Sequence, residues 1–264
     1  ITYVVDVRRG KVPVASLVDF GLYLSFFPHL VAGPIVRAAE FLPQIARPRS
    51  PTKVAVGTGI VLIALGLVKK LVLADHLARG VVDPVFAVPE QYGGADALLA
   101  IYGYTAQIYC DFSGYTDMAI GLALLFGVRF PQNFDRPYAS LGFQEFWRRW
   151  HISLSRFLRD FLYIPLGGSR GSKLKTARNL FLTMLLGGLW HGAAWGFVLW
   201  GAIHGAMLVL ERTLKERTSW RPRPWVRWII TFHLVALAWV PFRATDLSTA
   251  GALLGRLGES GAAT

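Results

Sequence analysis

Cysteine and charged residues are both scarce in this sequence. Cys110 is the only cysteine among 264 residues, which excludes a disulfide-stabilised scaffold and argues against a classical zinc site. Charged residues make up 17% of the chain, against about 25% in a typical soluble domain. With 53% hydrophobic and 13% aromatic residues, the chain is too apolar to remain disordered in water. The composition therefore predicts a membrane-embedded protein.

Acidic residues are scarce even relative to the basic ones. The chain has 16 Asp and Glu against 28 Lys and Arg, so its formal net charge is +12. In a membrane protein such an excess is typical of cytoplasmic loops, and this favours the membrane over nucleic acid as the partner. We expect a multi-pass protein of the cell (inner) membrane. The chain opens at Ile1 without a start methionine or signal peptide, so we expect an internal fragment of a longer protein.

Four long apolar segments are candidates for membrane helices, because a helix needs about 20 apolar residues to cross a bilayer. They are residues 12–32, 54–73, 97–128 and 228–242. Pro28 and Gly33 predict that the first helix stops at or inside the membrane and is followed by a loop over 37–53.

Charged residues inside two of these segments need a polar environment. Lys69 and Lys70 lie near the end of the second segment, where we expect their long side chains to reach the lipid head groups. Asp111 and Asp117 lie within the third segment and should face protein or water, because a carboxylate is costly in lipid. They are candidates to orient a histidine or to bind a proton or cation, and equally to be buried hydrogen-bonded acids of the helix bundle.

Residues 143–162 have the pattern of a single amphipathic helix. Aromatic and aliphatic side chains fall on one face at helical spacing, and His151 lies at its border. This predicts a helix lying in the membrane interface. The opposite face carries four arginines: Arg148, Arg149, Arg156 and Arg159. Two interpretations stay open for them: cytoplasmic anchors of the helix, or a binding site for an anionic carrier such as the phosphates of coenzyme A.

Residues 179–210 contain no Asp, Glu, Lys or Arg, and the segments on both sides are basic. Both flanks are expected to be cytoplasmic, which predicts a broken or re-entrant helical hairpin. Gly188, Gly192 and Gly196 predict a ridge of small residues on a helix, with His191 beside it. His191 should face a packed neighbour or a cavity, as a functional group or as an interhelical hydrogen-bonding partner.

The titratable residues favour acid–base chemistry over covalent catalysis. His151 and His191 could supply a general base and a second proton donor or orienting group. No activated nucleophile is evident, because Cys110 lies in an apolar run and no serine occupies a nucleophile elbow. No metal site is predicted. A transporter with a His and Asp proton relay is the alternative, but it requires repeated halves, and the sequence contains no internal repeat.

Four ordered stretches make the sequence recognisable: FFPHLVAGPIVRAAEFLPQ (26–44), YCDFSGYTDMAIGLALLFGVRFPQNFDRPY (109–138), FWRRWHISLSRFLRDFLYIPLGGSRG (146–171) and LFLTMLLGGLWHGAAWGFVLWGAIHG (180–205). They resemble the membrane-bound O-acyltransferase family, and within it the alginate O-acetylation type of bacterial branch. The D-alanyl transferases of teichoic acid synthesis have a similar RWH segment. The PLGGSRG that follows here is more similar to the alginate type.

The resemblance implies an all-α polytopic membrane protein, with a ring of tilted transmembrane helices and re-entrant or interfacial helices around a central tunnel. It implies one membrane domain over 1–264 that lacks the first and last membrane helices of the family. His191 of the WHG motif is the implied catalytic residue and His151 of the RWH motif the second essential one. Arg148, Arg149, Arg156, Arg159, Asp111 and Asp117 are the expected substrate-binding residues.

The implied reaction transfers an acyl group, most simply acetyl, from a cytoplasmic thioester to a hydroxyl acceptor. Acetyl-CoA is the expected donor, used as a substrate, and no bound cofactor is expected. The expected partners are the lipid bilayer and a periplasmic or extracytoplasmic acetyltransferase that acetylates an exopolysaccharide such as alginate. The alternative within the family is D-alanyl transfer from a carrier protein to a cell-wall polymer.

Overall fold

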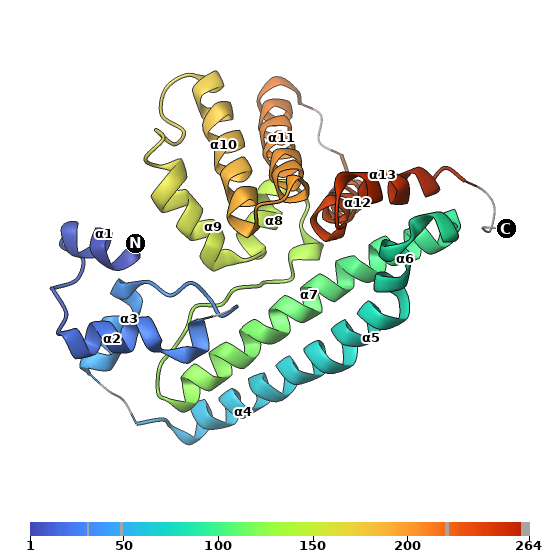
Figure 1. Cartoon of the computed structure of the whole chain (residues 1–264). Helices are drawn as coiled ribbons and strands as arrows, with labels where there is room; N and C mark the ends of the chain where they lie inside the picture. The colour runs from blue at the N-terminus through green and yellow to red at the C-terminus, as the bar shows by residue number, and fades with distance from the viewer. Residues whose placement is uncertain (31, 48–49, 220–221, 260–264) are drawn as a thin grey trace. The chain divides into compact units, whose positions relative to one another are not determined.

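The computed structural model describes all residues except 31, 48–49, 220–221 and 260–264, and every regular element in the described part is helical (Figure 1). The chain forms two compact units. The first comprises Ile1–Leu73 and Tyr109–Asn133, and the second comprises Ala74–Ile108 and Phe134–Thr264. Each unit is described by itself.

The first unit begins with the short helices α1 (Thr2–Arg8) and α2 (Leu17–Ser25), followed by the 3-10 turn Phe27–His29. The predicted membrane helix over 12–32 is therefore wrong in its extent. Ser16 caps the start of α2, five residues after the predicted start, and its hydroxyl oxygen accepts a hydrogen bond from the Asp19 N–H at 3.1 Å. Phe26 follows the helix in an extended conformation and ends it. The helix spans nine residues, which is less than half of what a bilayer crossing needs.

Helix α3 (Ala38–Ala46) occupies part of the predicted loop over 37–53, so that prediction is wrong there. Ala38, Phe41 and Leu42 are buried, in the spacing of an amphipathic helix. The Phe41 ring packs 5.1 Å from that of Phe26. This burial stabilises the helix despite Pro43 in its interior.

The predicted helix over 54–73 is confirmed as α4 (Lys53–Leu67) and the π-helical turn Val68–Ala74. It packs along the part of α7 (Gly94–Leu125) that belongs to the first unit (Figure 1). Glycines allow this approach, since a Cβ atom on Gly66 would lie 2.4 Å from the carbonyl oxygen of Gly114.

The lysines of the π-helical turn bind carboxylates of α7, which corrects the expectation that they reach the lipid head groups. Lys69 Nζ lies 2.6 Å from Asp117 Oδ2, and Lys70 Nζ lies 2.5 Å from Asp111 Oδ1. An isolated ammonium or carboxylate is costly at membrane depth, whereas the pair compensates both charges.

In the second unit the helical run continues through α5 (Asp75–Leu77), the π-turn Ala78–Val82 and α6 (Asp83–Ala87). The predicted single helix over 143–162 is wrong. The structure has α8 (Phe143–Arg149), α9 (Ile152–Leu158) and the π-turn Arg159–Tyr163. The chain breaks between α8 and α9, where His151 has a φ of +42°.

Residues 143–162 are amphipathic despite the break. Phe146 and Trp147 are buried in α8, as are Trp150, Leu154 and Leu158 further along. The exposed side chains are those of Gln144, Arg148, Arg156 and Arg159.

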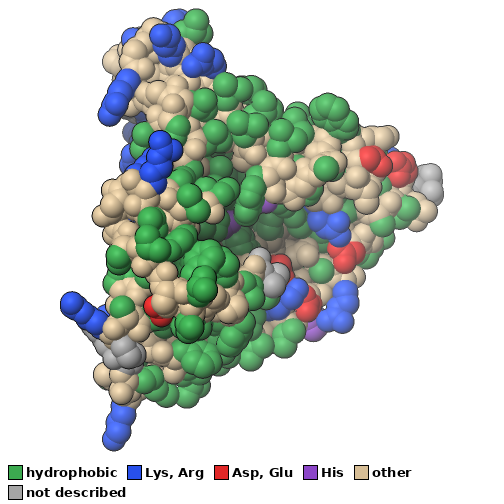
Figure 2. Space-filling model, turned by 60° about the vertical axis from the view of Figure 1, so that its left-hand side comes forward, with side chains coloured by type: hydrophobic (Ala, Val, Ile, Leu, Met, Phe, Trp, Pro, Cys, Tyr) green, Lys and Arg blue, Asp and Glu red, His purple; other side chains and the backbone are tan. Residues whose placement is uncertain are grey.

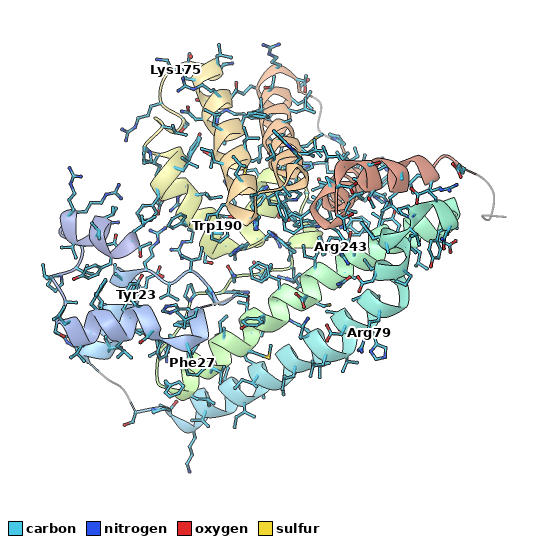
Figure 3. The ribbon with its side chains drawn as sticks, in the orientation of Figure 1. Tyr23, Phe27, Arg79, Lys175, Trp190 and Arg243 are labelled. Atoms are coloured by element: carbon cyan, nitrogen blue, oxygen red, sulfur yellow. The ribbon has the colours of Figure 1, made fainter. Side chains whose placement is uncertain are left out.

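The predicted helical hairpin is present as α10 (Lys173–His191) and α11 (Trp195–Arg217), which lie side by side (Figure 1). Its helices are longer than the uncharged stretch suggested, because the basic flanks are also helical. With 19 and 23 residues they extend roughly 28 and 34 Å. Lys175 lies at one end of α10 and Trp190 at the other (Figure 3).

The predicted glycine ridge on one helix is wrong, because α10 ends at His191 and Gly192 already caps it. The close contact is instead between the two helices of the hairpin. A Cβ atom on Gly188 would lie 2.3 Å from the Phe197 carbonyl oxygen, and one on Gly201 would lie 2.5 Å from the Met184 carbonyl oxygen.

Helix α12 (Pro224–Arg243) confirms the predicted membrane helix over 228–242, and α13 (Leu247–Arg256) follows it. Among the described residues, three helical runs are long and apolar enough to cross a membrane: Lys53–Ala87, Trp195–Arg217 and Pro224–Arg243. Hydrophobic side chains cover much of the face seen in Figure 2. These features fit a membrane protein.

The glycine contact yields a stability prediction. Gly201→Ala should destabilise the protein by about 1–3 kcal/mol, because the added methyl group forces α10 and α11 apart. Gly57→Ala is the matched control, since a Cβ atom there meets nothing within 4 Å and alanine favours the helix. Thermal unfolding in detergent should give a lower Tm for Gly201→Ala and an unchanged or slightly higher Tm for Gly57→Ala. Equal Tm values for the two variants would contradict this packing.

Candidate active site

His151 is held in an unusual backbone conformation between α8 and α9. Its φ of +42° lies in the left-handed region, which is sparsely populated by non-glycine residues and is enriched at functional sites. The carbonyl oxygen of His151 accepts the Ser155 N–H at 2.9 Å at the start of α9. Only 5% of the residue is exposed.

The burial of His151 determines its protonation. Desolvation lowers its pKa from 6.5 to about 3, and the nearby His191 makes a smaller contribution in the same direction. The imidazole is therefore neutral at physiological pH, so one ring nitrogen can donate a hydrogen bond and the other can accept one.

His191 is the last residue of α10, and aromatic side chains of α11 and α12 fix its ring. Its centroid lies 5.2 Å from that of Trp200 and 5.3 Å from that of Phe242, both in edge-to-face geometry. The glycine contact between α10 and α11 sets the position from which His191 reaches these rings.

A chain of aromatic contacts runs from His191 to the residue before His151. Trp200 stacks on Trp239 with ring centroids 5.6 Å apart, and Trp239 packs 4.9 Å from Trp150. The structure thus brings the two histidines of the sequence motifs into one aromatic cluster of the second unit.

His204 is a third histidine of this cluster, and the sequence reasoning missed it. It is fully buried in α11, one helical turn after Trp200. Trp147 Nε1 donates a hydrogen bond to its Nδ1 at 3.3 Å. The available signal was its position within the uncharged stretch, four residues after a tryptophan.

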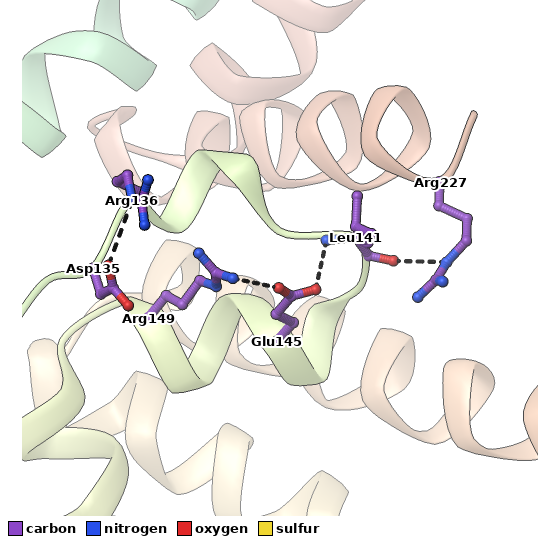
Figure 4. Close-up of polar contacts among 6 residues, drawn as sticks. All are labelled: Asp135, Arg136, Leu141, Glu145, Arg149 and Arg227. Atoms are coloured by element: carbon purple, nitrogen blue, oxygen red, sulfur yellow. Dashed lines mark hydrogen bonds and ion pairs between the residues drawn. The ribbon is translucent and has the colours of Figure 1, made fainter. Parts of the chain in front are cut away.

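Two of the four predicted arginines line a common cavity. Arg148 and Arg149 border a polar cavity of about 450 Å³ together with Lys215 and Arg227. Three carboxylates, those of Asp135, Glu145 and Glu211, also border it. Glu145 holds Arg149 at 2.7 Å (Figure 4). Arg227 Nε donates to the Leu141 carbonyl oxygen at 3.1 Å, also seen in Figure 4.

The remaining predicted site residues lie elsewhere. Arg156 and Arg159 are outside the lining of this cavity, and Arg159 Nε lies 2.6 Å from Asp160. Asp111 and Asp117 belong to the first unit, where the lysine pairs hold them. In the described part of the chain, no three His, Cys, Asp or Glu side chains gather as metal ligands would.

The profile of the membrane-bound O-acyltransferase family matches residues 7–243. The chain belongs to this family. It is 50% identical over 251 residues to the probable alginate O-acetylase AlgI of Pseudomonas aeruginosa, a match that covers 95% of this chain and 48% of that protein.

More distant relatives carry other names. The peptidoglycan O-acetyltransferase of Helicobacter pylori is 42% identical, over 94% of this chain and 48% of that protein. The teichoic acid D-alanyltransferase of Bacillus subtilis is 28% identical, over 92% of this chain and 65% of that protein. The chain spans about half the length of the alginate and peptidoglycan relatives.

The buried state of His151 predicts a pH-dependent stability. Its folded pKa lies below the unfolded value of 6.5, so its contribution is present above pH 6.5 and is lost as the pH falls toward 3. Between pH 7 and 4.5 the loss is on the order of 2 kcal/mol. Thermal unfolding in detergent should therefore show a smaller drop in Tm over this range for His151→Gln than for the wild type.

His233→Gln is the control for this measurement, because His233 is exposed on α12. It should follow the wild-type pH profile. A His151→Gln profile parallel to that of the wild type would show that His151 does not resist protonation in the folded protein.

Proposed function

We propose that this chain carries the catalytic centre of a membrane O-acyltransferase that moves an acetyl group from a cytoplasmic thioester to a hydroxyl acceptor. The observation that carries the proposal is the aromatic cluster that holds both His191 and His151. The names of the alginate and peptidoglycan relatives support a polysaccharide as the final acetylated product.

In the proposed reaction His191 acts as general base. It takes the proton of the acceptor hydroxyl while the hydroxyl oxygen bonds to the carbonyl carbon of the thioester. The tetrahedral intermediate collapses, the carbon–sulfur bond breaks, and the thiolate receives the proton from His191. His151 orients the reacting groups or stabilises charge on the thioester oxygen as a neutral hydrogen-bond donor.

Acetyl-CoA is the proposed donor, with its phosphates at the cavity bordered by Arg148, Arg149, Lys215 and Arg227. These four cations outnumber the three carboxylates of the cavity and supply directed N–H groups for phosphate. Arg156 and Arg159 then remain as anchors of the interface. D-alanyl transfer from a carrier protein is the second candidate, and the similarity to the D-alanyltransferase supports it more weakly.

The proposed setting is the inner membrane, with the protein crossing it several times in the family's ring of helices around a tunnel. An extracytoplasmic acetyltransferase is the proposed partner that receives the acyl group and passes it to the exopolysaccharide. The apolar helices of the structure support the membrane part of this proposal.

The role of His191 can be tested by paired substitutions in the membrane-embedded protein. His191→Ala and His191→Gln should each reduce acyl transfer from acetyl-CoA by at least 10²-fold with normal insertion, because glutamine cannot accept the proton. The matched control is His233→Gln, which should retain wild-type transfer. Robust transfer by His191→Gln would show that this residue serves only as a hydrogen-bonding group.

The donor site can be tested by comparing arginines inside and outside the cavity. Arg148→Ala should raise the KM for acetyl-CoA several-fold and make it more sensitive to salt, with little change in kcat. Arg156→Ala should leave this KM unchanged. Similar KM values for both variants would place the donor phosphates elsewhere.

A further inference from the structure

Three buried ring nitrogens have no hydrogen-bond partner among the described residues, and they belong to Trp200, which contacts His191, and to two rings packed against Trp200. They are Nε2 of His204, Nε1 of Trp200 and Nε1 of Trp239. The residues themselves are at most 1% exposed. An unsatisfied buried polar group costs about 1–3 kcal/mol and calls for an explanation.

All three nitrogens are hydrogen-bond donors. Because Nδ1 of His204 accepts from Trp147 Nε1, the proton of the neutral imidazole is on Nε2. The indole nitrogen of tryptophan can only donate. The group therefore lacks an acceptor, and we call His204, Trp200 and Trp239 the donor cluster.

The rings of the donor cluster are neighbours. The centroid of His204 lies 4.9 Å from that of Trp200 and 6.2 Å from that of Trp239. Trp200 also meets His191 edge-to-face at 5.2 Å. Trp200 thus connects the donor cluster to the proposed general base.

A cavity of about 330 Å³ lies near this point, between the turn that precedes α11 and the end of α12. Phe197 and Phe242 are part of its lining, and both pack against His191. Phe242 also packs 5.1 Å from Trp200. Phe242 therefore lines the cavity and also contacts both the proposed general base and a member of the donor cluster.

We propose that the donor cluster binds the carbonyl oxygen of the acyl group during transfer. This proposal rests on the proposed function. A carbonyl oxygen accepts hydrogen bonds and donates none, which matches a group of donors that lacks an acceptor. As the acceptor oxygen bonds to the carbonyl carbon, negative charge develops on the carbonyl oxygen and the N–H groups stabilise it. The proton of the acceptor hydroxyl goes to His191. His151 then has the role of orienting the reacting groups.

Two substitutions of His204 distinguish the roles of its two ring nitrogens. The side-chain oxygen of asparagine can replace Nδ1 as the acceptor for Trp147, but His204→Asn has no donor at the Nε2 position. The amide nitrogen of glutamine can reach that position, so His204→Gln keeps the donor and loses the acceptor. We expect kcat for acyl transfer to fall about 10²-fold in His204→Asn with KM nearly unchanged, and to fall less than tenfold in His204→Gln.

Trp200→Phe provides a second variant that keeps an aromatic ring and removes only the N–H group. It should lower kcat about 10²-fold at a normal folded yield. Trp225→Phe is the matched control, because Trp225 is 59% exposed at the start of α12, and it should retain wild-type kcat.

The proposal is overturned if His204→Asn and Trp200→Phe both keep wild-type kcat. It is also overturned if these two variants lower the Tm but leave kcat unchanged, because the N–H groups would then bind a buried structural water and not the acyl group. In both cases wild-type transfer and its loss in His191→Ala would persist, so the proposed function would survive. A wild type without acyl transfer would overturn both proposals.

Discussion

The contact between α10 and α11 at Gly188 and Gly201 is the constraint on which the candidate site depends. The two backbones approach so closely that no Cβ atom fits at either position. This approach fixes the register of the hairpin, and with it the height of His191 relative to Trp200. Lipid tails are as apolar as the helix surfaces, so the hydrophobic effect does not drive helices together inside a membrane. Close van der Waals packing of this kind is therefore a main source of stability there.

The aromatic cluster then determines the chemistry available to the histidines. His151 is almost fully buried and neutral, His204 is fully buried, and His191 is partly buried among aromatic rings. In such surroundings a hydrogen bond to a developing negative charge is stronger than it would be in water. The same surroundings make a permanently charged side chain costly, and the arginines accordingly lie at the exposed side of α8 and α9.

The sequence predicted the features that depend on long apolar runs and on local motifs. The helices over 54–73 and 228–242 and the hairpin over 179–210 are present, because length and hydrophobicity suffice to identify them. The helix over 38–46 was not predicted, because Pro43 lies in its interior and the burial of Phe41 and Leu42 is evident only in the folded chain.

Other features depend on contacts between distant residues. The lysine–aspartate pairs join residues 48 and 41 positions apart, and no pattern within one helix shows which lysine meets which carboxylate. His204 became visible as part of the candidate site only when α8, α11 and α12 were placed around it. The helical wheel of 143–162 failed because it assumed continuous helical dihedral angles through His151.

The left-handed conformation of His151 marks the turn between the proposed donor cavity and the second proposed catalytic histidine. Arg149 borders the polar cavity, and His151 follows only two residues later, so their Cα atoms lie within about 7 Å of each other. A continuous helix would place residues 149 and 151 about 200° apart, on opposite faces of that helix. The break at His151 separates α8 from α9, so the partly exposed Arg149 ends one helix and the buried His151 caps the start of the next. The backbone strain at His151 is therefore the local cost of a turn that places a partly exposed arginine and a buried histidine two residues apart.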